Sequence, residues 1–130
     1  MDGLVRMALD LRGTRYRSGG DEPSRGFDCS GFVHYVYARQ GVDVPRTVVE
    51  QFRAGTPVST SALQAGDLVF FSTSAPGATH VGIVIGASAP GAFVHAPADG
   101  GAVRTERLDA SYWHSRIVGA RRIIFPFAQE

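Results

Sequence analysis

The chain has 130 residues, of which 44% are hydrophobic and 10% aromatic, with 13 basic and 12 acidic side chains and one cysteine. This length fits one compact domain covering residues 1–130, and the aromatic content with a net charge of only +1 argues against intrinsic disorder. Binding of nucleic acid or an anionic membrane needs clustered positive charge, which nearly equal numbers of basic and acidic residues do not suggest. A single cysteine excludes an intramolecular disulfide.

Apolar runs in the chain are short. Examples are residues 81–85 and 68–71, far below the roughly 18–20 residues that a membrane-spanning helix needs. The N-terminus lacks the basic start, long apolar stretch and small-residue cleavage site of a secretory signal. We therefore expect no membrane span, and either a cytoplasmic protein or a chain that begins after a removed leader.

The first half of the chain has apolar residues at helical spacing. Three helices are predicted: Asp2 to about Leu11, Cys29 or Ser30 to Gln40, and a short one that follows Thr47 and ends near Gly55. Asp28 or Ser30 is the expected cap of the second helix, and Gly41 its end. Residues 13–26, rich in glycine and polar side chains, predict a long loop of the kind that often carries function.

After Pro57 the pattern changes to short apolar runs separated by glycine and proline. Five strands are predicted: Asp67 to Ser72, His80 to Ile85, Ala92 to Ala96, Val103 to Arg107 and Arg116 to Ile124. A single helical turn is expected within residues 108–115. Helices followed by closely spaced strands favour an α+β fold in which helices pack against one face of an antiparallel sheet.

Cys29 stands at the predicted start of the second helix, directly after the glycine-rich loop. Free amide hydrogens and the positive end of the helix dipole favour the thiolate there, which predicts a nucleophile. The alternative is a small buried hydrophobe, a common role for a lone cysteine. The polar neighbours Asp28 and Ser30 argue for the nucleophile.

A nucleophilic cysteine needs a base, and an imidazole suits this task because its pKa lies near neutral pH. His34 lies five residues beyond Cys29 on the helix and His114 lies in a predicted turn, so both are expected to be structural. His80 and His95 lie at strand ends, where a rigid sheet can present them to the helix terminus. Cys29 as nucleophile, His80 as base and His95 as the residue that orients the base form a consistent triad.

Other roles for these residues remain open at this point. The two histidines could be half-buried structural residues. A zinc site of Cys29, His80 and His95 is conceivable, but spacings of 51 and 15 residues match no compact metal-ligand pattern. We therefore expect no metal.

Six segments, taken in order, resemble the NlpC family of bacterial cell-wall cysteine peptidases. They are Tyr16 to Gly20, Phe27 to Phe32, Pro45 to Thr47 with Gln51, Gly66 to Phe71, His80 to Gly86 and Phe93 to Ala96. The resemblance spans nearly the whole chain. It implies a papain-like α+β fold, with N-terminal helices packed on a mostly antiparallel sheet of about five to six strands.

The resemblance also implies roles for individual residues. Cys29, His80 and His95 take the three catalytic positions. Tyr16 matches a tyrosine whose hydroxyl helps to hold the oxyanion, although it could instead anchor its loop. Asp28 and Ser30 match residues that line the pocket for the substrate peptide, a role compatible with helix capping.

Three further positions lie outside the expected catalytic set. Ser18 replaces a bulky aromatic residue that relatives often have, so one subsite wall is expected to differ in shape. Arg46 either meets a substrate carboxylate or bonds a nearby carbonyl. Asp67 is most simply a turn residue leading into its strand.

The function implied by the resemblance is peptidoglycan hydrolysis without a metal or organic cofactor. Such a monomeric endopeptidase cuts stem peptides, most often between D-γ-glutamyl and a diamino acid such as meso-diaminopimelate. Alternatives are a cell-wall amidase or acyl transferase on the same scaffold, and a catalytically silent domain that binds wall peptide or a protein partner. The expected location is the cell envelope or the secreted fraction, and the chain would then be an excised catalytic domain or one exported by another route.

Overall fold

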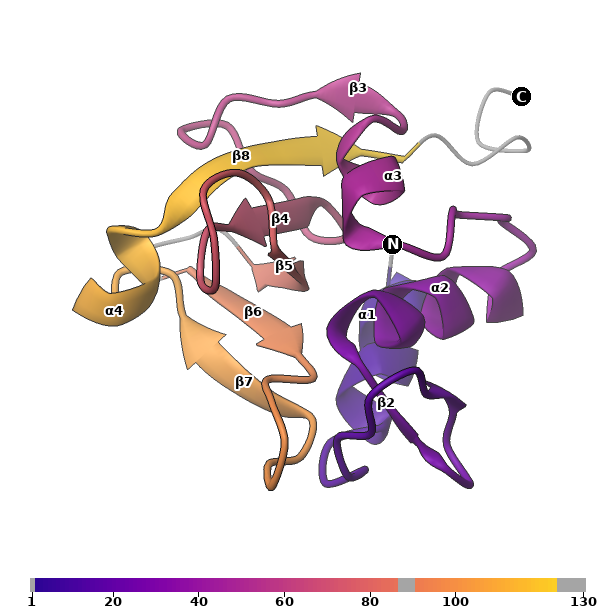
Figure 1. The fold of residues 1–130 in the computed structure, drawn as a ribbon. Coiled ribbons are helices and arrows are strands. Elements are labelled where there is room, and N and C mark those ends of the chain that lie inside the picture. Colours follow the sequence, from indigo (N-terminus) through magenta and orange to yellow (C-terminus); the bar gives the residue numbers. More distant parts are fainter. Residues whose placement is uncertain (1, 87–90, 124–130) are drawn as a thin grey trace.

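The computed structural model describes residues 2–86 and 91–123 (Figure 1). Three helices come first, α1 (Asp2–Asp10), α2 (Cys29–Arg39) and α3 (Val48–Phe52), and a single turn of helix, α4 (Ser111–His114), precedes the last strand. Asp28 caps α2, and Thr47 caps α3 by accepting a hydrogen bond from the amide of Glu50. The three predicted helices and the predicted helical turn are therefore confirmed.

A six-stranded antiparallel sheet follows the helices, in the order β3-β8-β4-β5-β6-β7. Its strands are β3 (Thr56–Pro57), β4 (Leu68–Phe71), β5 (His80–Gly86), β6 (Ala92–His95), β7 (Arg104–Arg107) and β8 (Ile117–Arg122). The five predicted strands correspond to β4 to β8; the predicted end of the last, Ile124, lies outside the described residues. The α+β architecture with a mostly antiparallel sheet is confirmed.

Three short strands were absent from the prediction. Within the expected loop, β1 (Asp21–Glu22) pairs with β2 (Gly26–Phe27), and β3 pairs with β8 at the sheet edge. Each has only two residues, too few to show the alternation by which a strand is recognised in a sequence.

Alternating side chains of the central strands build two apolar layers. Leu68 and Phe70 on β4 belong to the main core between the sheet and the helices, whereas Val69 and Phe71 belong to a smaller cluster on the opposite face. Trp113 of α4 packs against that smaller cluster. His80 has the same parity along β5 as Val84, and its ring contacts Phe71 and Trp113, so it lies on the face covered by α4.

Asp67 does more than start its strand. It accepts a hydrogen bond from the amide of Gln64 at 2.8 Å, as a turn residue does, but its buried carboxylate also receives two hydrogen bonds from Arg122, at 2.8 and 2.9 Å. This bidentate pair ties the start of β4 to the end of β8.

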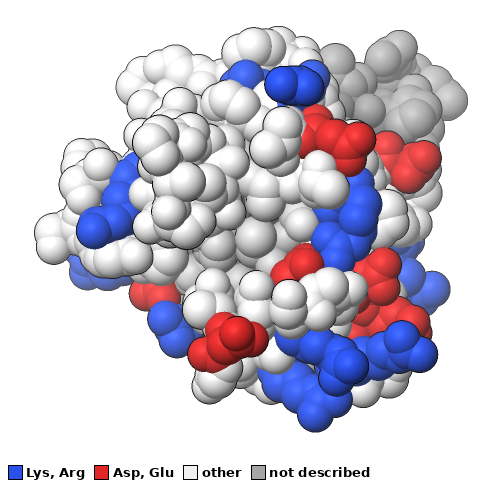
Figure 2. All heavy atoms as spheres, in the orientation of Figure 1, with Lys and Arg blue, Asp and Glu red and all other residues white. Residues whose placement is uncertain are grey.

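Charged side chains are mixed on the surface. On the face shown in Figure 2, arginines lie beside aspartates and glutamates, and much of the remaining surface is uncharged. In the part of the chain that is described, no helix is long and apolar enough to cross a membrane.

Candidate active site

The first turn of α2 is held by the side chain of Asp28. Its Oδ1 accepts a hydrogen bond from the amide of Gly31 at 2.7 Å, and its Oδ2 accepts one from the amide of Gly19 at 3.0 Å. Cys29 is therefore the first residue of the helix, as predicted, and the cap also anchors the glycine-rich loop beside it.

The guanidinium of Arg46 forms hydrogen bonds with residues of the same helix turn and of the loop beside it. Its Nη1 donates to Ser30 Oγ at 2.9 Å and lies 3.0 Å from Asp28 Oδ1, and its Nη2 donates to Asp28 Oδ2 at 3.1 Å and to the Gly20 carbonyl at 3.3 Å. Of the two roles considered for Arg46, the structure supports bonding within the protein. A Cβ on Gly31 would overlap the Gly20 carbonyl, so only glycine allows this close packing.

The Cys29 thiol lies mostly buried at this terminus. Burial is the largest influence on its pKa and raises it to about 11, although a hydrogen bond from the backbone amide of Val81 lowers it. Asp28 raises the pKa further, and the amides of Ser30 and Cys29 lower it. The prediction that the helix terminus favours a thiolate is wrong for the resting site, because burial outweighs the amides that act in the expected direction.

His80 and His95 form a direct pair on neighbouring strands. His80 Nε2 lies 2.7 Å from His95 Nδ1, and both side chains are buried. Burial lowers the pKa of each histidine to about 3; the neighbouring His95 also lowers that of His80, and Arg104 also lowers that of His95. Both rings are therefore neutral at pH 7. The amide that reaches the Cys29 sulfur belongs to Val81, the residue after His80, so the thiol lies at the start of β5, where His80 stands.

Close backbone packing brings the two histidine strands together. A Cβ on Gly82 would lie 2.7 Å from the ring of Phe93 and 3.3 Å from the Cβ of His95. A larger residue at this position would have to displace the ring of Phe93, so Gly82 allows the close packing of β5 and β6 beside the two imidazoles.

Tyr16 lies close to the thiol. Its side chain is half-buried, and its pKa is raised first by burial and then by Cys29, Asp28 and Asp99. Its backbone amide donates to the Gly101 carbonyl at 2.9 Å, which fixes this part of the loop. The structure thus gathers Tyr16, Asp28 and Ser30 around Cys29.

Two residues that the sequence analysis missed contact the histidine pair. The indole of Trp113 stacks on His80 with ring centroids 5.4 Å apart and meets His95 edge-on at 4.9 Å. The carboxylate of Glu106 on β7 lies 3.4 Å from His95 Nε2 and accepts a 2.7 Å hydrogen bond from Arg104 Nε. A sequence signal exists for Glu106, since the predicted strand from Val103 follows that of His95 closely enough to form a hairpin.

A cavity of about 430 Å³ reaches His80 from this side. Its lining includes Thr73, Pro97, Ala98, Arg104, Glu106, Tyr112 and Trp113. It gives an extended ligand room to lie against the imidazole of His80.

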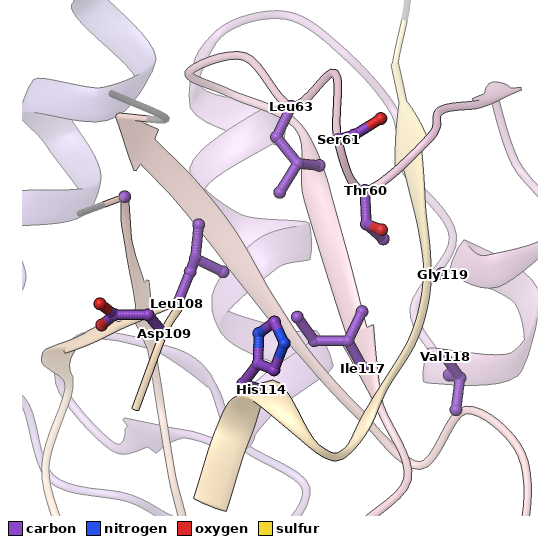
Figure 3. A pocket seen from close by; sticks show the side chains of 10 residues that line it. Thr60, Ser61, Leu63, Leu108, Asp109, His114, Ile117, Val118 and Gly119 are labelled. Atoms are coloured by element: carbon purple, nitrogen blue, oxygen red, sulfur yellow. The ribbon is translucent and has the colours of Figure 1, made fainter. Parts of the chain in front are cut away.

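The remaining two histidines lie apart from this pair. His34 Nδ1 is 2.7 Å from the Val44 carbonyl, which agrees with the predicted structural role. His114 is exposed and lines a separate cavity of about 660 Å³ together with Asp109, Leu108 and Ile117 (Figure 3). None of the predicted site residues lines that second cavity. Across residues 2–86 and 91–123, no three His, Cys, Asp or Glu side chains group as metal ligands would.

Comparison with known proteins gives concordant matches. The model of the NlpC/P60 family matches residues 13–122. The chain is 42% identical over 118 residues to the murein DD-endopeptidase MepH of Escherichia coli, covering 88% of this chain and 42% of that protein. It is 36% identical over 123 residues to the gamma-DL-glutamyl hydrolase of Bacillus subtilis, covering 92% of this chain and 29% of that protein.

A solved structure agrees with the fold. The crystal structure of an NlpC/P60 family protein from Bacillus cereus superimposes with a TM-score of 0.86 at 32% identity, covering 95% of this chain and 40% of that one. The chain thus spans less than half the length of each of these three relatives. With a family match over most of its length and the same helix-and-sheet architecture, the chain belongs to the NlpC/P60 family.

Proposed function

We propose that residues 1–130 form a single catalytic domain, a cysteine endopeptidase that cuts peptidoglycan stem peptides. The observation that carries the proposal is the position of Cys29 at the first turn of α2, hydrogen-bonded by the amide of Val81 next to the His80–His95 pair. NlpC/P60 relatives named as murein and glutamyl hydrolases support the substrate class.

Cys29 acts as the nucleophile and His80 as the general base. Because His95 occupies Nε2 of His80, Nδ1 is the ring nitrogen left to accept the thiol proton. The sulfur attacks the scissile carbonyl as this proton leaves, and His80 then delivers the proton to the departing amine as the C–N bond breaks. Water subsequently adds to the thioester carbonyl, releases the carboxylic acid and restores the Cys29 thiol.

The resting protonation states favour this order of events over a preformed ion pair. A thiol pKa raised to about 11 and a His80 pKa lowered to about 3 both oppose charge separation before substrate arrives. The negative charge forms when the carbonyl oxygen becomes an oxyanion. In this proposal the backbone amide of Cys29 and the hydroxyl of Tyr16 donate hydrogen bonds to the oxyanion, and such a donor is typically worth about 2.7–4 kcal/mol.

For the bond cut, we propose the link between D-γ-glutamyl and a diamino acid such as meso-diaminopimelate. In this proposal Asp28 and Ser30, which flank Cys29 in the sequence, contact the bound peptide. The two curated relatives above are named for different bonds, so cleavage of a D,D cross-link is the competing outcome. The chain acts as a monomer in the cell envelope or after secretion.

The test uses defined muropeptides, one with only the γ-glutamyl–diamino acid bond and one with a D,D cross-link. Wild type and Cys29→Ala are incubated with each, and fragments are read by mass. Wild type is expected to cut the first substrate and Cys29→Ala neither. Release of whole stem peptides from muramic acid would identify an amidase, and no cleavage by wild type, or equal cleavage by Cys29→Ala, would contradict the proposal.

A further inference from the structure

The hydrogen-bonded chain of the active site continues past His95 to a carboxylate. His95 on β6 lies opposite Arg104 on β7, and Glu106 is two residues further along the same strand. Glu106 Oε2 lies 3.4 Å from His95 Nε2, and the same oxygen accepts a 2.7 Å hydrogen bond from Arg104 Nε. The His95 side chain is fully buried, whereas that of Glu106 is 22% exposed and that of Arg104 is 55% exposed.

The direction of this chain can be worked out from proton positions. To accept the thiol proton at Nδ1, neutral His80 must carry its own proton on Nε2 and donate it to Nδ1 of His95. Neutral His95 must then carry its proton on Nε2. That proton needs an acceptor, and an ionised carboxylate can only accept.

The opposite arrangement would disable the base. With the His95 proton on Nδ1, the proton of His80 would move to its Nδ1, and that nitrogen could no longer take a proton from Cys29. The 2.7 Å distance between the two imidazoles requires one donor and one acceptor, so the tautomers of the two rings change together.

We propose that Glu106 is a positioning residue that fixes the tautomers of both histidines, and that Arg104 holds its carboxylate in place. The proposal rests on the proposed function, since it assigns His80 as the base. Glu106 then acts as a fourth member beside the predicted triad. This role explains why Glu106 and Arg104 form an ion pair on the mostly exposed strand β7, directly beside the buried His95.

The other groups around His95 cannot do this. His80 on β5 uses the Nδ1 side of the ring, and Trp113 of α4 meets the ring edge-on and has only a donor N–H. Arg104 is a cation and likewise only donates. Glu106 is therefore the acceptor that the described structure gives to His95 Nε2.

The experiment compares Glu106→Ala, which removes the acceptor, with Glu106→Gln, which keeps an oxygen that Arg104 can orient. Asp109→Asn is the matched control, because Asp109 accepts hydrogen bonds from an arginine two residues earlier, as Glu106 does, but is exposed and touches neither His80 nor His95. Histidine ring tautomers are read by long-range ¹H–¹⁵N NMR at neutral pH. His34 serves as an internal reference, since its Nδ1 lies 2.7 Å from a carbonyl and must carry the proton.

Wild type is expected to show Nε2–H for His80 and His95 and Nδ1–H for His34. Glu106→Ala should move His80 and His95 toward Nδ1–H, and kcat on a cleaved stem peptide should fall about tenfold, at the low end of the range for partners that orient a functional histidine, with KM within about twofold. Glu106→Gln should recover most of both signals. Asp109→Asn should match wild type.

Two results would overturn the proposal: Nε2–H on both histidines in Glu106→Ala, or a loss confined to KM, which would make Glu106 a substrate contact. The NMR measurement needs no substrate. If wild type cuts no stem peptide, the proposed function fails while the tautomers still decide the role of Glu106. Unchanged thermal melting of Glu106→Ala excludes a general loss of folding as the cause.

Discussion

The indole of Trp113 lies face to face with the imidazole of His80, with ring centroids 5.4 Å apart and an angle of 27° between the planes. The same indole meets His95 nearly at a right angle, with centroids 4.9 Å apart. One side chain from a single turn of helix therefore covers part of both histidine rings. This cover contributes to the burial that lowers the pKa of each ring.

Replacing Trp113 by alanine should loosen the His80 ring. We expect kcat on a stem peptide to fall between about tenfold and about a hundredfold, because small displacements of a catalytic group are costly. The free energy of unfolding should fall by about 2 kcal/mol, less than for a fully buried tryptophan. Steady-state kinetics and urea unfolding measure the two effects.

Two variants sharpen this test. Trp113→Phe keeps an aromatic face and should retain more activity than Trp113→Ala. His114→Ala removes the next ring in α4, which faces the other cavity, and should leave kcat unchanged. Equal losses in His114→Ala and Trp113→Ala would show that disruption of α4, and not the stacked ring, is responsible.

The Cys29 thiol should remain protonated at neutral pH. Burial raises its pKa to about 11, so thiolate absorbance should appear with a midpoint well above that of an ordinary thiol. The chain has one cysteine, so the Cys29→Ala spectrum gives a direct background. His80→Gln should leave the midpoint almost unchanged. A midpoint below pH 7 that is lost in His80→Gln would instead indicate a thiolate–imidazolium pair.

Asp28 should contribute to stability in two separable ways. Asp28→Ala removes the cap of α2 and leaves Arg46 without its carboxylate, and we expect the free energy of unfolding to fall by about 2 kcal/mol. Asp28→Asn keeps a capping oxygen and should lose about half as much. Asp21→Asn removes only an exposed contact 3.8 Å from Arg46 and should change the value by less than about 0.5 kcal/mol. Urea unfolding measures these changes. Similar losses of unfolding free energy in all three variants would contradict separate contributions from the cap and from the contact with Arg46.

Local patterns in the sequence were sufficient to predict most of the helices and strands. The start of α2 was predictable because an aspartate precedes the helix and apolar residues follow at helical spacing, and the structure places the first helical residue at Cys29. Strands β4 and β5 were predictable from continuous apolar runs. Strands β1 and β3 were not, because two-residue strands depend on partners elsewhere in the chain, as Thr56 depends on Arg122.

The site was only partly predictable, for a different reason. His80 and His95 stood out as polar residues at the ends of apolar strands, and the structure joins them. Trp113 could not be identified, because its contact with His80 depends on how α4 folds back over the sheet. The prediction that Cys29 is a thiolate was wrong, because the sequence shows the helix terminus but not the depth to which the thiol is buried.

Burial of the two neutral histidines should make the protein less stable in mild acid. In the unfolded chain a histidine takes up a proton below its ordinary pKa of 6.5, whereas folded His80 and His95 resist protonation down to about pH 3. The unfolded state therefore binds more protons between these limits, and the free energy of unfolding should fall as the pH drops from 6.5 toward 3. Each histidine contributes up to about 1.4 kcal/mol per pH unit in this window.

Urea unfolding at pH 7, 6 and 5 measures this effect above the ordinary titration range of aspartate and glutamate, about 3.9–4.3. The slope should be smaller in His80→Gln, which removes one of the two buried rings, and unchanged in His114→Gln, whose ring is exposed. Stability that is flat from pH 7 to 5, or that falls equally in wild type and His80→Gln, would mean that folded His80 takes up its proton near the ordinary pKa. His80 would then exist largely as imidazolium in mild acid, where it could no longer accept the proton of Cys29.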